Sequence, residues 1–110
     1  MNWLTVCKVS DLQPNSGVCA LVSDKQIALF YFPKQNAVYA ISNFDPFGEA
    51  NVLSRGIIGD YHGEIVVASP LLKQHFNLKT GVCLENADVK IPAYACRIEN
   101  DVVQITAESL

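Results

Sequence analysis

The chain has 110 residues, half of them hydrophobic and 17% charged, which excludes a disordered chain and fits one globular domain over residues 1–110. Eleven acidic and eight basic residues give a net charge of −3 without any basic cluster, which excludes an electrostatic nucleic-acid-binding surface. The longest apolar run, IALFYF, is far shorter than the ~20 residues of a membrane-spanning helix, and we expect no membrane contact.

Strand-like runs recur along the chain between clusters of turn residues. They read in order GVCALVSD, QIALFYFP, AVYAISNF, EIVVAS, AYACRI and VVQITA, at residues 17–24, 26–33, 37–44, 64–69, 93–98 and 102–107. The second run does not alternate, which indicates a strand buried on both faces, whereas residues 93–99 alternate and predict one wet face. Short strands joined by turns predict an all-β fold, a small antiparallel sandwich or barrel of two layers.

The remaining segments show weaker patterns. Residues 43–63 and 69–92 are expected to form two long loops at one end of the domain. No window sustains the 3.6-residue periodicity of a helix, although residues 9–12 and 50–55 could each form a single turn. Helix content is therefore predicted to be low.

The N-terminal stretch MNWLTVCKVSDLQ lacks the basic and apolar regions of a secretory signal, so we expect a cytoplasmic protein with reduced thiols. The four cysteines are widely spaced, and none forms the C-x-x-C spacing of zinc or redox sites. Each lies in or beside an apolar run, as small buried hydrophobes do. The sequence therefore predicts core thiols at Cys7, Cys19, Cys83 and Cys96.

Motifs of common active sites are absent, since the chain has neither a glycine-rich phosphate loop nor a nucleophile elbow. His62 and His75 stand alone. Asp45, Asp60 or Glu64 would have to be recruited as further metal ligands, and no spacing favours any of them. We expect solvent or loop-packing roles for both histidines, no catalytic residue and no metal site.

Two longer stretches resemble a known family: SNFDPFGEANVLSRG at residues 42–56 and ASPLLKQHFNLKTG at residues 68–81. Together with the opening Trp3 and DLQP and the closing YACRIENDVVQI, they make the whole chain similar to Rieske-type ferredoxin domains. In that superfamily C-x-H on one loop and C-x-x-H on a second hold a [2Fe–2S] cluster. The resemblance implies a Rieske-like fold with these two loops at one end.

The same resemblance locates the positions that would hold the cluster. Asp45 and Ser69 stand where the two cysteines should be, and Phe47 and Leu72 stand where the two histidines should be. Phenylalanine and leucine side chains have no atom that binds a metal. All four ligands are therefore replaced in a loop frame that is otherwise kept, apart from an extra residue or two in the first loop.

Within this superfamily the two motifs are most similar to the small-subunit family of NAD(P)H-dependent nitrite reductases, which lacks the cluster ligands. The resemblance implies an accessory subunit that binds, stabilises or orients a large subunit. It further implies that FAD, siroheme and an iron–sulfur cluster belong to that large subunit, which reduces nitrite to ammonium. The candidate partner-facing residues are Phe44, Pro46, Phe47, Leu71 and Leu72.

Two other functions stay open on the sequence. The chain could be a Rieske-type electron-transfer ferredoxin with a non-standard ligand, drawn from Asp45, His75 or a cysteine. Such a carrier would take up a coloured cluster. It could also be a free-standing module that binds a small molecule or another protein.

Phe47 and Leu72 also pose a packing question, because a vacated cluster site has to be filled. They either pack against each other as an apolar plug or project as a patch that docks the large subunit. The plug is the favoured interpretation, since a small domain seldom leaves a large apolar pair fully in water. We also predict that the segments near residues 43–56 and 69–81 lie side by side at one end, so that Asp45 and Ser69 do not stand at opposite ends of the molecule.

Overall fold

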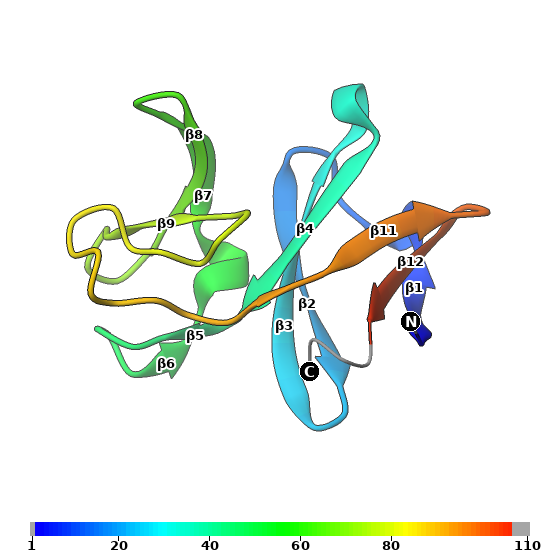
Figure 1. Cartoon of the computed structure of the whole chain (residues 1–110), viewed down its shortest axis with the longest axis horizontal. Coiled ribbons are helices and arrows are strands. Elements are labelled where there is room, and N and C mark those ends of the chain that lie inside the picture. Colours follow the sequence, from blue (N-terminus) through cyan, green and yellow to red (C-terminus); the bar gives the residue numbers. More distant parts are fainter. Residues whose placement is uncertain (1, 107–110) are drawn as a thin grey trace.

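The computed structural model describes residues 2–106, which form antiparallel β-structure with three short 3-10 turns (Figure 1). The all-β prediction is confirmed. Over this range no helix has both the length and the hydropathy needed to cross a membrane. The three turns are η1 (Val9–Asp11), η2 (Pro33–Gln35) and η3 (Leu53–Arg55).

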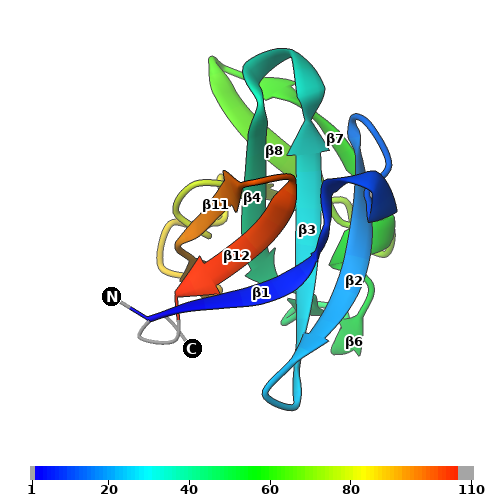
Figure 2. The same ribbon diagram turned by 90° about the vertical axis from the view of Figure 1, so that its right-hand side faces the viewer.

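A four-stranded sheet lies between two three-stranded sheets (Figure 1). The central sheet has the order β10 (Ala93–Tyr94), β4 (Ala37–Ser42), β3 (Lys25–Phe32), β2 (Ser16–Val22). The sheet that carries both ends of the described chain has the order β1 (Trp3–Lys8), β12 (Val102–Thr106), β11 (Cys96–Glu99) (Figure 2). The third sheet has the order β7 (Ile57–Tyr61), β8 (Glu64–Ala68), β9 (His75–Asn77), and a separate ribbon pairs β5 (Phe44–Asp45) with β6 (Ala50–Asn51).

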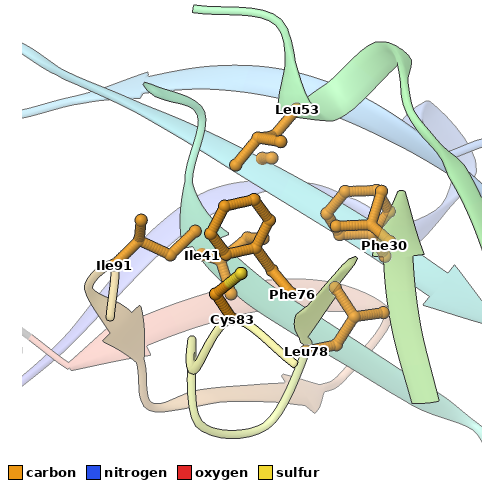
Figure 3. Packing of buried hydrophobic residues seen from close by; sticks show 9 residues of the cluster. Phe30, Ile41, Leu53, Phe76, Leu78, Cys83 and Ile91 are labelled. Carbon is orange, nitrogen blue, oxygen red and sulfur yellow. The ribbon is translucent and has the colours of Figure 1, made fainter. Parts of the chain in front are cut away.

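Strand β3 explains how the layers are held together. Successive side chains of a strand point to opposite faces. Ile27 and Leu29 pack into the core beneath β12, with Val103 and Ile105. Ala28 and Phe30 pack into the opposite core, around Phe76 and Leu53 (Figure 3). These four consecutive side chains of β3 are all buried, which confirms the expectation of a strand covered on both faces.

Two expectations about the architecture are wrong. The fold has three sheet layers rather than two, because the sheet β7-β8-β9 covers the second face of the central sheet. The segments 43–63 and 69–92 are not strandless loops either, since they contain β5, β6 and β7, and β9. The expected turn at 50–55 is likewise shorter, with a 3-10 turn only at Leu53–Arg55, whereas the turn near residues 9–12 is confirmed as η1.

The missed strands share one physical cause, which is a weak apolar alternation. Strand β7 is mostly exposed and contains Gly59 and Asp60. Strand β1 shifts register against β12 between Thr5 and Cys7, so an irregularity interrupts its period of two. Strands of two or three residues such as β5, β6 and β9 are too short to show any period. Ala107, expected at the end of the last strand, lies outside the described residues.

The cysteines do not share one environment. Cys83 is fully buried and Cys7 and Cys96 are half-buried, which agrees with core thiols, but Cys19 is exposed and the expectation is wrong there. Strand β2 lies at the edge of the central sheet, and there Cys19, which pairs with Ala28 of β3, stays exposed. Burial, together with the neighbouring Cys7, raises the pKa of the Cys96 thiol to about 12. All four thiols are free.

Candidate functional site

The two Rieske-like loops meet at one end of the molecule through a buried hydrogen bond. The Ser69 hydroxyl donates to Asp45 Oδ2, and both side chains are almost completely buried. Asp45 ends β5, and Ser69 follows β8 directly, so the bond joins two elements that are 24 residues apart. We call this pair the Asp45–Ser69 clasp. The two segments therefore lie side by side at one end, as predicted, and Asp45 and Ser69 are in direct contact.

Each half of the clasp also organises its own loop. Asp45 Oδ1 accepts hydrogen bonds from the backbone N–H groups of Phe47, at 2.9 Å, and of Gly48, at 3.3 Å. Ser69 Oγ accepts one from the Leu71 N–H at 3.3 Å. Side chains of aspartate and serine favour such local turns. Both oxygens of the buried Asp45 carboxylate therefore accept hydrogen bonds, as a buried charge or polar group requires.

A second contact between the loops depends on a glycine. A Cβ atom added at Gly48 would lie 2.4 Å from Leu71 Cδ1, so Leu71 lies directly over the backbone of the first loop. Glycine at position 48 leaves room for this approach, whereas a side chain there would displace the end of the exposed Leu71 side chain. The two loops are thus joined by two contacts, the polar Asp45–Ser69 clasp and the apolar approach of Leu71 to Gly48.

Phe47 and Leu72 behave differently from each other. Phe47 is half-buried and packs against the main apolar cluster, with its ring 6.2 Å from that of Phe76 and tilted by 44°. Leu72 is 57% exposed and does not join that cluster. The expectation that both form one plug is therefore wrong for Leu72, and of these two residues only Phe47 packs against the core.

The other candidate contact residues lie around this end with varied exposure. Phe44 and Leu71 are exposed, at 42% and 46%, whereas Pro46 is half-buried. Ile57, which sequence reasoning missed, is 78% exposed at the start of β7. One exposed apolar side chain is ordinary, whereas a group of exposed apolar side chains that lie together marks an interaction site.

The histidines and acidic residues considered as metal ligands have other partners. Asp60 Oδ1 accepts the Gly63 N–H, and Glu64 Oε1 accepts from the Asn77 side chain at 2.7 Å. His75 stacks on Tyr61 with ring centroids 4.6 Å apart, and its Nδ1 lies 2.6 Å from Glu85 Oε2. No group of three potential ligand residues comes together anywhere in residues 2–106.

Glu85 is the acceptor in this pair. Partial burial raises the pKa of Glu85, but hydrogen bonds from the His75 backbone N–H and ring outweigh that effect and leave the pKa below its ordinary value. An ionised carboxylate only accepts, so His75 Nδ1 carries the proton in this bond. The loop-packing role expected for His75 is confirmed, while His62 is exposed and lies edge-on to Tyr61.

Sequence reasoning also missed a pocket beside the clasp. It measures about 460 Å³ and is lined by Arg55, Ile57, Ala68, Ser69, Pro70, Lys73 and His75. Strand pairing places Ile57 opposite Ala68, and the loop that follows β8 then turns back across them. The two cations are 18 residues apart in the chain and belong to no motif, so only the pairing of β7 with β8 brings them together.

The described positions also test whether a [2Fe–2S] cluster fits here. Such a cluster needs four donor atoms, from two cysteines and two histidines in the Rieske arrangement. Phe47 and Leu72 offer no donor atom, and the Asp45 and Ser69 side chains are turned toward each other by the clasp. This set of residues does not fit the cluster.

Comparison with known proteins gives a consistent result. The model of the Rieske-like [2Fe-2S] domain family matches residues 2–106. The nitrite reductase (NADH) small subunit of Escherichia coli (strain K12) is 47% identical over 103 residues, which cover 94% of this chain and 95% of that protein. The chain belongs to the Rieske-like family of nitrite reductase small subunits.

Two further comparisons extend this assignment. The NMR structure of the E. coli protein NirD superposes with a TM-score of 0.86 at 46% identity and covers 94% of each chain. The nitrite reductase [NAD(P)H] large subunit of Klebsiella oxytoca is 38% identical over 108 residues, which span 98% of this chain but 11% of that protein. A small-subunit-like segment therefore exists within a large-subunit polypeptide.

Proposed function

We propose that this chain, as one domain over residues 1–110, is the accessory small subunit of a cytoplasmic NAD(P)H-dependent nitrite reductase. It binds the large subunit, holds no iron–sulfur cluster and has no activity alone. The large subunit, with its FAD, siroheme and iron–sulfur centre, reduces nitrite to ammonium. The loop residues Phe44, Pro46, Phe47, Leu71 and Leu72 face that partner.

The Asp45–Ser69 clasp is the observation that carries this proposal. The two loops are held here by a buried hydrogen bond between Asp45 and Ser69, the residues that the resemblance assigns to the cysteine positions. Phe47, which the resemblance assigns to a histidine position, packs on Phe76. The fold can thus keep its loop end in shape without a metal centre, which is what an accessory subunit requires.

The Klebsiella relative supports the choice of partner. A segment similar to 98% of this chain forms 11% of a large subunit there. When one protein exists both as a separate chain and as a segment of a larger one, the separate chain is expected to bind the rest of that larger protein. Exposed apolar residues at the loop end, such as Leu72 and Ile57, suit a surface that is covered in a complex.

Copurification and turnover test the proposal together. The chain and the large subunit of the same organism are coexpressed, with an affinity tag on the large subunit only. We expect the chain to copurify and the complex to consume nitrite with NADH, while the chain alone consumes none. The large subunit without the chain should be less active. Nitrite turnover by the isolated chain, or no effect of adding it, would contradict the proposal.

The rival electron-carrier function is tested by reconstitution. The purified chain is incubated anaerobically with iron and sulfide, beside a Rieske-type ferredoxin that reports a working assay. We expect the chain to stay colourless, because two of its four ligand positions have no donor atom. As a matched comparison, the variant Asp45→Cys, Phe47→His, Ser69→Cys, Leu72→His restores both ligand pairs. Visible charge-transfer bands in the unmodified chain would establish the carrier.

A further inference from the structure

The pocket beside the clasp has an uncommon charge for this protein. Arg55 and Lys73 both line it, and no acidic side chain does, although the whole chain carries a net charge of −3. Among residues 2–106, neither the Arg55 guanidinium nor the Lys73 ammonium makes an ion pair or a side-chain hydrogen bond. The pocket thus holds two positive charges that nothing in the described chain neutralises.

His75 adds a polar wall of fixed orientation. Its Nδ1 donates to Glu85 and its ring stacks on Tyr61, so the imidazole cannot turn freely. Ser69 belongs to the pocket wall too, but its hydroxyl is already committed to Asp45. The main hydrogen-bond donors that remain for a ligand are therefore the Arg55 guanidinium and the Lys73 ammonium.

The rest of the wall is apolar and continues into the exposed surface. Ile57 and Pro70 line the pocket, and Ile57 projects into water over most of its surface. Leu71 and Leu72 follow Pro70 directly and are both exposed. A free inorganic anion could pair with the two cations but would gain nothing from the apolar wall. A protein segment with one carboxylate between apolar side chains would match both the charges and the apolar wall.

We propose that this pocket is the socket for an acidic side chain, an aspartate or glutamate flanked by apolar residues, on the large subunit. The inference rests on the proposed function, because it names the contact through which the partner is held. Arg55 and Lys73 pair with the carboxylate, and Ile57, Leu71 and Leu72 cover the apolar residues on either side of it. The clasp keeps the Ser69 end of the socket in place.

Charge reversal with a matched control tests the socket. The socket variant is Arg55→Glu with Lys73→Glu, and the control variant is Lys8→Glu with Lys34→Glu. Each pair changes the net charge by the same amount. Lys8 and Lys34 are exposed, at the end of β1 and in η2, away from the β7-β8-β9 sheet (Figures 1 and 2). Unfolding midpoints of all variants are measured first, so that a binding loss is read only from folded protein.

Affinity for the purified large subunit is then measured by titration at low and at physiological salt. We expect the socket variant to bind at least about tenfold more weakly than the unmodified chain, with a smaller dependence on salt. The control variant should bind within about threefold of the unmodified chain. Equal losses in both variants, or none in the socket variant while the unmodified chain binds, would overturn the socket and leave the proposed function standing. If the unmodified chain does not bind at all, the proposed function itself is refuted.

Chemical crosslinking tests the acidic occupant directly. A zero-length carbodiimide joins a lysine amine to a carboxylate in contact with it, and mass spectrometry identifies both residues. We expect a crosslink from Lys73 to an aspartate or glutamate of the large subunit. The variant Lys73→Arg keeps the charge and should keep binding, but its guanidinium does not form the crosslink, so that product should disappear. A complex that forms normally and gives no Lys73 crosslink in the unmodified chain would overturn the acidic side chain as occupant.

Sodium nitrite and sodium acetate serve as small-anion probes of the same pocket. If either anion binds the chain without weakening its association with the large subunit, the acidic side chain as occupant is also overturned.

Discussion

Ser69 donates its hydroxyl hydrogen bond to Asp45 across the meeting point of two loops, at a depth where both side chains are almost entirely removed from water. The same carboxylate accepts two backbone N–H groups of its own loop. One buried aspartate thus holds the turn of the first loop and the start of the second.

We predict that Asp45→Ala lowers the free energy of unfolding by about 2–4 kcal/mol, because it leaves two N–H groups and a hydroxyl without their acceptor. Ser69→Ala should cost less, about 1–2 kcal/mol, since Asp45 keeps its two N–H donors. Urea unfolding of both single variants and of the double variant gives the coupling energy. A coupling near zero would show that the clasp contributes nothing to stability.

Phe47 and Leu72 are predicted to separate stability from binding. Phe47→Ala should cost about 1–2 kcal/mol of unfolding free energy, below the range for a fully buried ring because Phe47 is only half-buried. Leu72→Ala should change it by less than about 0.5 kcal/mol, yet weaken association with the large subunit. Urea unfolding and a binding titration on the same two proteins check this. A large stability loss in the Leu72 variant would mean that it packs inside the fold after all.

Two glycines with nearly the same φ angle offer a matched comparison. Gly63 and Gly81 have φ values of +82° and +79°, which side chains rarely adopt. A Cβ at Gly81 would lie 2.0 Å from the Ile91 carbonyl oxygen, whereas nothing lies within 4 Å of one at Gly63. We expect Gly63→Ala to cost about 1 kcal/mol from strain alone and Gly81→Ala about 3 kcal/mol or more. Thermal and urea midpoints measure the difference, and equal costs would contradict the close approach.

The thiols should react with iodoacetamide in the order of their exposure and pKa. Cys19 is exposed and should be alkylated first in the folded protein. Cys83 is fully buried, and burial raises the pKa of Cys96 to about 12, so that the reactive Cys96 thiolate is scarce near pH 8. Both thiols should be alkylated slowly or not at all. Mass spectrometry of peptides after timed reactions measures the order. Fast labelling of Cys96 without unfolding would contradict its burial.

Much of the fold was predictable because local pattern and burial agree in this chain. The uninterrupted apolar run of β3 indicated two covered faces, and the alternation near Cys96 and Ile98 indicated one. Both predictions are confirmed. A strand buried on two faces needs apolar residues at every position, whereas a strand with one wet face needs them only at every second position. The resemblance to the Rieske frame, carried by particular loop residues, also placed the two loops that hold Asp45 and Ser69 side by side at one end.

Other features depend on contacts between segments that the sequence keeps apart. The third sheet covers the central one through Phe76 and Val67, which no local period announces, and it turned two expected layers into three. Leu72 and Phe47 stand at equivalent positions of the two loops, yet one is exposed and the other covered, because only Phe47 meets Phe76. Burial of a side chain is decided by what packs over it, and that comes from elsewhere in the chain.

The sequence by itself determined the class of fold and the buried central strand, and its resemblance to Rieske domains assigned the cluster-ligand positions to named residues. Tertiary structure alone decided that Asp45 and Ser69 bond to each other and that Arg55 and Lys73 share a pocket. The physical reason is that residue identity fixes which donors, charges and apolar groups exist. The pairing of β7 with β8 and the folding back of the loop after Ser69 fix which of them meet.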